Sequence, residues 1–172
     1  MFLKTRILFI IGCISALATS CSDSRVRTKP HIPESDTDLV TGCYYITDDT
    51  SHVKRFLDQE QRSFYLDPHA IVTVDHFESI RKTMEYGCQI EITLDETGAE
   101  ALKVATGKSI DKRIGVVVDN YLLMAPVVQG EIAGGRFVIS GGFDKKEQER
   151  IYSFIDHEMY ETPAKAESAP QQ

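Results

Sequence analysis

Cysteine thiols are the side chains of this 172-residue chain whose type and position point most directly to chemistry. Of the four cysteines, Cys21 follows Ala18 and Ser20, small residues of the kind that a signal peptidase accepts near its cut. The Cys21 thiol is the only nucleophile in this stretch that could carry a thioether-linked lipid. Cys21 is therefore the candidate lipid-attachment residue.

The residues before Cys21 predict an export signal. Lys4 and Arg6 form a positive start, and residues 7–17 form an apolar run of signal-peptide length, too short for a comfortable permanent membrane span. We therefore expect a signal peptide over residues 1–20. An ordinary signal peptide that is cut nearby, without lipid attachment, is the alternative.

The stretch Leu17-Ala18-Thr19-Ser20-Cys21 resembles the lipobox of bacterial lipoproteins, although Leu is commoner than Ala18 at three residues before the Cys. The resemblance implies cleavage before Cys21 and a mature protein held by its lipid at a membrane of the bacterial cell envelope, facing the periplasm. Ser22 after the lipidated cysteine favours the outer membrane in enterobacterial sorting.

Two cysteines, Cys43 and Cys88, remain in the mature domain, since Cys13 leaves with the signal peptide. In an oxidising compartment such a pair suggests a disulfide. The alternative is two separate buried thiols, each behaving as a small apolar side chain. We expect no zinc site, because the histidines share no repeated spacing with the cysteines. The five histidines are His31, His52, His69, His76 and His157.

The other reactive side chains do not predict an enzyme. Ser140 precedes two glycines, but no sequence signature supplies its base. Asp95 and Asp119 stand at predicted element ends, where acids usually cap helices or form turns. His157 follows Asp156 on a predicted helix, and neighbouring helix positions do not face each other. No phosphate loop or dinucleotide fingerprint occurs, so we expect no catalysis and no cofactor.

The charge balance argues against nucleic acid as a partner. The whole chain has a formal net charge of −7, and the mature chain without Lys4 and Arg6 has 17 basic and 26 acidic side chains, a net charge of −9. Such a surface is repelled by phosphate backbones, and no Lys/Arg cluster is interleaved with aromatic residues.

Composition divides the mature chain into a tether, one domain and a tail. Residues 21–38 are polar and contain Pro30 and Pro33, while residues 162–172 are rich in Pro, Ala and Gln. Neither stretch has the apolar spacing needed to bury a face, so we expect a flexible tether and a disordered tail. Residues 39–161 are long enough for a single domain with one modest core.

Short β-prone runs in this domain predict a sheet. The predicted strands are residues 43–46, 64–66, 71–74, 90–94 and 136–140, and the first two end at Asp48-Asp49 and Asp67-Pro68. Ile90, Ile92 and Leu94 alternate with polar residues, which indicates one buried face.

A hairpin is predicted where two apolar runs, residues 114–118 and 121–125, flank Asp119 and Asn120. Both turn residues tolerate positive φ, as a two-residue hairpin turn requires.

Two amphipathic helices complete the predicted fold. Asp95 is placed to cap a helix that ends near Gly107, and Asp144 with Glu147 forms a capping signature before the apolar face of a final helix. Strands with two such helices predict an α+β fold, with a mixed, mainly antiparallel sheet and both helices packed on one side.

The order of these elements and the residues that form them resemble the head subdomain of the first periplasmic domain of SecD, a subunit of the protein-export translocase. The resemblance lies mainly in residues 65–158. The stretches that carry it are Tyr65-Leu66-Asp67-Pro68, Asp95 to Ala99, Asp111 to Asp119, Ala125-Pro126-Val127-Val128, Ile132 to Arg136, and Ile139-Ser140-Gly141-Gly142-Phe143.

The resemblance implies structural roles for two glycine pairs. Gly134 and Gly135 would let the chain turn between strands, and Gly141 or Gly142 would permit positive φ before the last helix. Members of the family often carry Asp-Gly where this chain has Asp119-Asn120, which keeps the turn chemistry.

The resemblance also implies a lipid-anchored, non-catalytic module that binds polypeptide in protein export or envelope assembly. This chain shows no membrane span beyond its predicted signal peptide, so it is not expected to be a proton-driven motor by itself. Tyr121 and Met124 are candidate apolar contacts for a client, with a purely core role as their alternative. The alternative function is a scaffold or inhibitor lipoprotein that binds one folded envelope protein.

Overall fold

The computed structural model describes residues 37–161. The predicted signal peptide, Cys21, most of the predicted tether and the predicted tail lie outside these residues. In chain order the elements are β1 (Gly42–Thr47), β2 (Val53–Leu57), β3 (Arg62–Thr73), the 3-10 turn η1 (Val74–His76), β4 (Phe77–Thr83), β5 (Cys88–Leu94), α1 (Glu96–Lys108), β6 (Ile114–Val118), β7 (Tyr121–Met124), β8 (Arg136–Phe143) and α2 (Lys145–Glu161).

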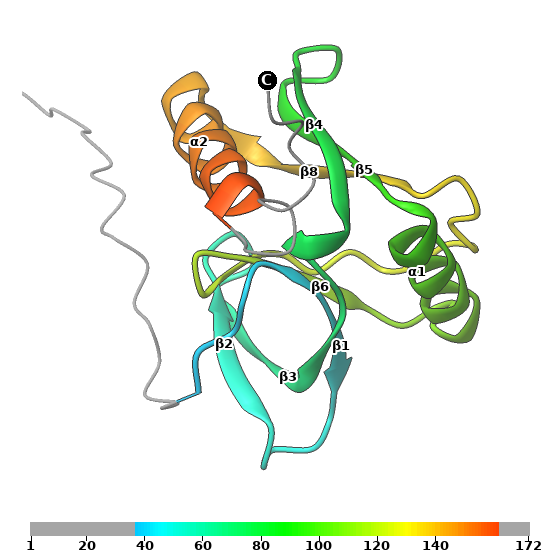
Figure 1. Ribbon diagram of the computed structural model, residues 1–172. Helices are drawn as coiled ribbons and strands as arrows, with labels where there is room; N and C mark the ends of the chain where they lie inside the picture. The colour runs from blue at the N-terminus through cyan, green and yellow to red at the C-terminus, as the bar shows by residue number, and fades with distance from the viewer. Residues whose placement is uncertain (1–36, 162–172) are drawn as a thin grey trace, which may run out of the picture.

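The strands form two sheets rather than one. A five-stranded sheet has the order β2-β3-β1-β6-β7, and a three-stranded sheet has the order β4-β5-β8. All neighbouring strands in both sheets are antiparallel. Figure 1 shows the first sheet in the lower half of the molecule, with the second sheet and α2 above it. The predicted α+β class, with mainly antiparallel strands and two helices, is confirmed.

The five-stranded sheet is curled, because its two edge strands come together. β2 and β7 are the outermost strands in the hydrogen-bonding order, yet they pack against each other. The side chain of Gln59, just after β2, donates to the backbone oxygen of Leu123 in β7 at 3.3 Å. A seam between two strand edges therefore runs along one side of this sheet.

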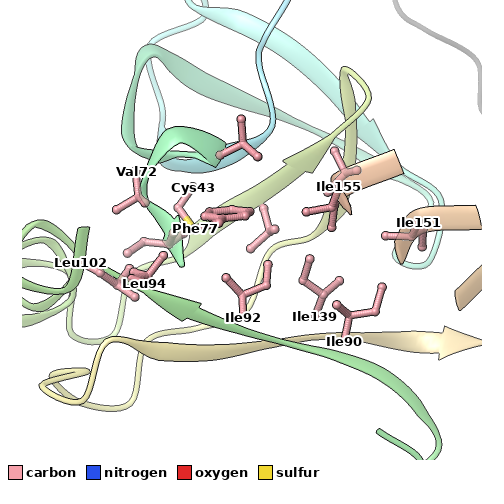
Figure 2. Packing of buried hydrophobic residues seen from close by; sticks show 14 of the residues in the cluster. Cys43, Val72, Phe77, Ile90, Ile92, Leu94, Leu102, Ile139, Ile151 and Ile155 are labelled. Atoms are coloured by element: carbon pink, nitrogen blue, oxygen red, sulfur yellow. The ribbon is translucent and has the colours of Figure 1, made fainter. Parts of the chain in front are cut away.

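The main core lies between the two sheets. Ile90 and Ile92 in β5 are fully buried, and Leu94 is nearly so, which confirms the alternation predicted for this strand. Figure 2 shows these residues facing Phe77, with Leu102 of α1 beside Leu94 and residues of α2 above β8. α2 packs on the three-stranded sheet, whereas α1 packs against β5 and against β3 of the five-stranded sheet.

A second, smaller cluster fills the inside of the curled sheet. Its members include Tyr44, Leu66 and Leu122. β6 contributes to both clusters, since Val116 faces the main core and Val117 faces the smaller one. Burial on both faces explains why the sequence of β6 is a continuous apolar run without alternation.

The helix ends follow the predicted capping chemistry. The Asp95 carboxylate accepts from the backbone N–H of Gly98 at 2.7 Å, and Asp144 accepts from the N–H of Glu147 at 2.7 Å. These bonds satisfy N–H groups that have no partner inside the helix. Ile151 and Ile155 lie on the buried face of α2, as predicted.

Three strand predictions need correction. β3 is one continuous strand through Asp67-Pro68, where the sequence predicted a stop. The Asp67 carboxylate accepts from the N–H of His69 at 2.8 Å, and the register to β1 shifts in this region, so the pair forms an irregularity within the strand and not its end. β2 and β4 were not predicted, because charged residues interrupt both of them.

Candidate functional site

The turn between β6 and β7 positions one wall of the candidate site. Asp119 and Asn120 adopt φ of 52° and 63°, the left-handed conformations of a two-residue hairpin turn. Asn120 is half-buried, and its side chain joins parts of the chain that are distant in sequence. Its amide oxygen accepts from the N–H of Leu39 at 2.9 Å, and its amide nitrogen donates to Asp38 at 2.7 Å.

Arg55 in β2 is the central partner of this turn, and the sequence did not indicate its role. Only 1% of its surface is exposed. Its guanidinium donates to the side-chain and backbone oxygens of Asn120 at 2.5 and 3.1 Å and to the backbone oxygen of Thr37 at 2.6 Å. Burial lowers the pKa of Arg55, and the Asp38 carboxylate opposes this shift. An arginine so paired stays charged at neutral pH.

These bonds fix the start of the described chain against the curled sheet. Thr37 and Asp38 belong to the predicted tether, yet both are held by hydrogen bonds to Arg55 or Asn120. Leu39 follows with 4% exposure and packs into the smaller core cluster. The chain therefore enters the domain at the seam between β2 and the β6–β7 turn.

A groove of about 510 Å³ lies along this seam. It is bounded by the end of β2, by β7 and by the junction of β8 with α2. Apolar side chains that are buried or half-buried form its floor, and mostly exposed charged side chains form its rim. The floor residues are Phe56, Leu57, Tyr121, Leu122, Leu123 and Phe143.

The rim of the groove is acidic. It carries four carboxylates and two cations, a net charge of −2. The charged rim residues are Asp58, Asp119, Asp144, Glu147, Lys146 and Arg150. A pocket with an apolar floor and a few charged groups at its edge is typical of ligand and peptide sites.

The structure separates the two candidate contact residues. Tyr121 is half-buried and lines the groove. Met124 is also half-buried, but its side chain packs against the main core and its sulfur accepts from the N–H of Ser140 at 3.4 Å. Tyr121 is thus placed to touch a ligand, whereas Met124 has the core position that was its alternative.

The four glycines singled out by the resemblance lie at both ends of β8. Gly135, in the turn before the strand, has a φ of 60° and approaches α1 so closely that a Cβ would lie 2.6 Å from Ala99 Cβ. Gly142 has a φ of 66° just before the α2 cap. Gly134 shares the turn with Gly135, and Gly141 gives room to the side chain of Gln59 beside the groove.

The predicted disulfide is absent from the structure, in which Cys43 and Cys88 are both free. Cys43 lies on β1 in the five-stranded sheet, whereas Cys88 begins β5 in the other sheet. The Cys88 sulfur contacts the Met84 sulfur at 3.5 Å instead. The alternative of two separate thiols therefore describes this structure.

The two thiols should differ sharply in reactivity. Burial raises the pKa of Cys43 to about 12, so its thiolate is scarce at pH 8, and its side chain is inaccessible. We expect iodoacetamide to modify Cys88 in the native protein at pH 8 and to modify Cys43 only after unfolding. Mass spectrometry of the digested protein measures both sites, and a Cys43–Cys88 cross-linked peptide would contradict this expectation.

Between residues 37 and 161, no three His, Cys, Asp or Glu side chains are grouped so that they could hold a metal ion. Across the same range, no helix has the length and apolar character needed to cross a bilayer.

Fold and groove together define a small α+β domain built from a curled sheet, with an open, acid-rimmed groove at the seam of that sheet. Residues 50–156, more than half of the chain, match the family described as SecDF, P1 head subdomain. This chain belongs to that family.

Two kinds of relative illustrate the match. The protein translocase subunit SecD of Magnetococcus marinus is 35% identical over 79 residues, which cover 45% of this chain and 15% of that protein. A solved structure titled "Structure and function of a membrane component SecDF that enhances protein export" has a TM-score of 0.54 at 18% identity. The match covers 69% of this chain and 63% of that one, and it shows the shared fold.

The chain spans only a small part of the curated relatives it matches. A second relative, SecDF of Thermus thermophilus, is 36% identical over 53 residues, which is 31% of this chain and 7% of that protein. The shared part corresponds to one subdomain of a much larger protein.

Proposed function

We propose that this chain is a lipid-anchored, non-catalytic module that binds extended polypeptide segments in protein export or envelope assembly. The observation that carries the proposal is the groove at the β2–β7 seam. It combines an apolar floor with strand edges, in a domain that belongs to the P1 head family. The relatives described above include a protein translocase subunit and a membrane component that enhances protein export.

The groove suits an extended chain better than a compact ligand. Strand edges present backbone N–H and C=O groups, and a peptide that lies along them can gain main-chain hydrogen bonds while its side chains fill apolar pockets. Tyr121 and Phe56 offer aromatic surface from the two strands that border the seam. Contacts of this kind accept many sequences, as a module for unfolded clients requires.

The proposed lipid at Cys21 would keep the groove near a membrane of the cell envelope, on its periplasmic side. The anchor would supply the membrane attachment that transmembrane helices supply in SecD. Export clients emerge close to the membrane, so an anchored groove would meet them before they fold.

Photocrosslinking tests the proposal. A photoreactive residue at position 121 should trap labelled, unfolded secretory chains, because Tyr121 lines the groove. A probe at Tyr86 is the matched control, since Tyr86 is 80% exposed at the β4–β5 turn and outside the groove. Capture of a single folded envelope protein at position 121 would favour the scaffold or inhibitor alternative, and equal labelling at both positions would contradict specific binding.

The anchor is tested in the same cells with Cys21→Ala. This variant should remain an unlipidated precursor and should lose the crosslinks at position 121 that depend on membrane proximity. Unchanged processing, with no acyl mass on the wild-type N-terminus, would refute the lipid attachment.

A further inference from the structure

We propose that residues 25–32 of this chain bind in the groove at the β2–β7 seam as an extended segment, so that the chain occupies its own binding site until a client displaces it. The inference rests on the proposed function in one respect, since the groove is the same one. The proposed occupant belongs to the same chain as the groove.

Two carboxylates on the rim of the groove form no ion pair with a cationic side chain among residues 37–161. Asp58 follows β2 and Asp119 begins the β6–β7 turn, so the two carboxylates lie at opposite strands of the seam. Neither forms an ion pair with any residue between 37 and 161. An occupant with apolar side chains on one face and basic side chains on the other would match both floor and rim.

Residues 25–32 have this pattern. The sequence is Arg25-Val26-Arg27-Thr28-Lys29-Pro30-His31-Ile32. Basic or imidazole side chains occupy every odd position, and apolar or small side chains occupy every even one. Extended chain places alternate residues on opposite faces. The segment is too short and too polar to form a core of its own, but it would present its basic side chains on one face and Val26, Pro30 and Ile32 on the other. Pro30 would be tolerated, because a strand that is added at a sheet edge can contain proline.

Charge makes the match selective. Residues 25–32 contain three basic residues and no acid, in a mature chain whose net charge is −9. The groove rim carries a net charge of −2. Attraction between the two is therefore local, against a surface that is acidic elsewhere.

The first described residues, Thr37 and Asp38, are held next to residues that line the groove. Thr37 is held by Arg55, whose neighbour Phe56 lines the groove, and Asp38 is held by Asn120, whose neighbours Asp119 and Tyr121 line it too. Residues 33–36 separate the segment from Thr37, and the five steps from residue 32 to Thr37 span at most roughly 18 Å. A short linker of this kind gives an effective concentration on the order of millimolar, which suffices for a weak contact to be mostly formed.

Occupation of the groove by residues 25–32 would raise the affinity that a client needs in order to bind there. A polypeptide would have to displace residues 25–32, so segments that combine apolar and basic side chains would compete best. With Cys21 four residues before Arg25, the occupied groove would also be held close to the proposed lipid anchor.

The test compares the mature lipidated chain, in detergent, with the variant Arg25→Glu, Arg27→Glu, Lys29→Glu. The probe is a fluorescent peptide with the sequence of residues 25–33, whose binding is followed by anisotropy. We expect the variant to bind the peptide about tenfold more tightly, because its own segment no longer competes. A photoreactive residue at position 121 should crosslink to residues 25–32 in the wild-type chain and not in the variant.

The control variant is Lys54→Glu, Lys108→Glu, Lys112→Glu. It makes the same change in net charge at three exposed positions that do not line the groove, and it should bind the peptide as the wild type does. Equal peptide affinity in all three proteins, or no crosslink from position 121 to residues 25–32, would overturn the inference.

The outcome separates this inference from the proposed function. Peptide binding with no capture of unfolded secretory chains would leave the cis contact standing and remove the proposed function. Equal capture of secretory chains by the wild type and the Arg25/Arg27/Lys29 variant would support the proposed function and overturn the cis contact.

Discussion

Replacement of Arg55 by methionine should lower the free energy of unfolding by about 3 kcal/mol. The substitution keeps a long side chain in β2 but removes the guanidinium that bonds Asn120 and Thr37. Because Arg55 is 1% exposed, these oxygens would lose a charged donor where water has little access. Urea unfolding followed by circular dichroism measures the change.

Two further variants show whether the loss comes from the network at the turn. Lys54→Met removes a neighbouring but exposed charge, and should change stability by less than about 0.5 kcal/mol. Asn120→Gly keeps the positive φ of the turn but removes the side chain that Arg55 contacts. Combined with Arg55→Met it should cost clearly less than the sum of the two single changes. A strictly additive result would show that Arg55 acts independently of the turn.

The network around Arg55 also shows where sequence reasoning stops. An arginine between Lys54 and Phe56 has the appearance of a solvated residue, so no local signal indicates that Arg55 is buried. It becomes buried only because the sheet curls and residues 37–39 cover its open end. Both are long-range events, and local hydrophobic periodicity carries no information on them.

Local signals were sufficient elsewhere. The β6–β7 turn, the Asp95 and Asp144 caps and the alternation in β5 were predicted correctly, because each depends on residues within a few positions of one another. β4 was missed for the opposite reason. It is an edge strand of which only Phe77 is buried, so it has no alternation to detect.

The candidate site contains some residues that the sequence indicated and others that it did not. The sequence singled out Tyr121 and the turn before it, and the structure places them at the groove. Phe56 and Asp58 were missed, because β2 reaches β7 only through the curl of the sheet. A site at a seam between sheet edges is assembled from strands that are far apart in sequence, so only its locally defined half could be predicted.

The second substitution with a large expected effect lies in β1, the central strand of the five-stranded sheet. Gly42→Ala should destabilise the domain by at least about 3 kcal/mol. Gly42 begins β1 and pairs with Thr73 in β3 and Val117 in β6. A Cβ at this position would lie 2.2 Å from the backbone oxygen of Val72. No rotamer change can relieve a clash with backbone, so β1 and β3 would have to separate.

Separation at this point would affect both core clusters, because β1 contributes Cys43 to the main cluster and Tyr44 to the smaller one. The expected loss is a large part of the total stability of a domain of this size. Gly130→Ala is the matched control, since a Cβ there meets nothing within 4 Å, and it should leave the unfolding midpoint nearly unchanged. If Gly42→Ala unfolded at the same urea concentration as this control, β1 and β3 could not approach as closely as the structure shows, and the curl that builds the groove would lose its support.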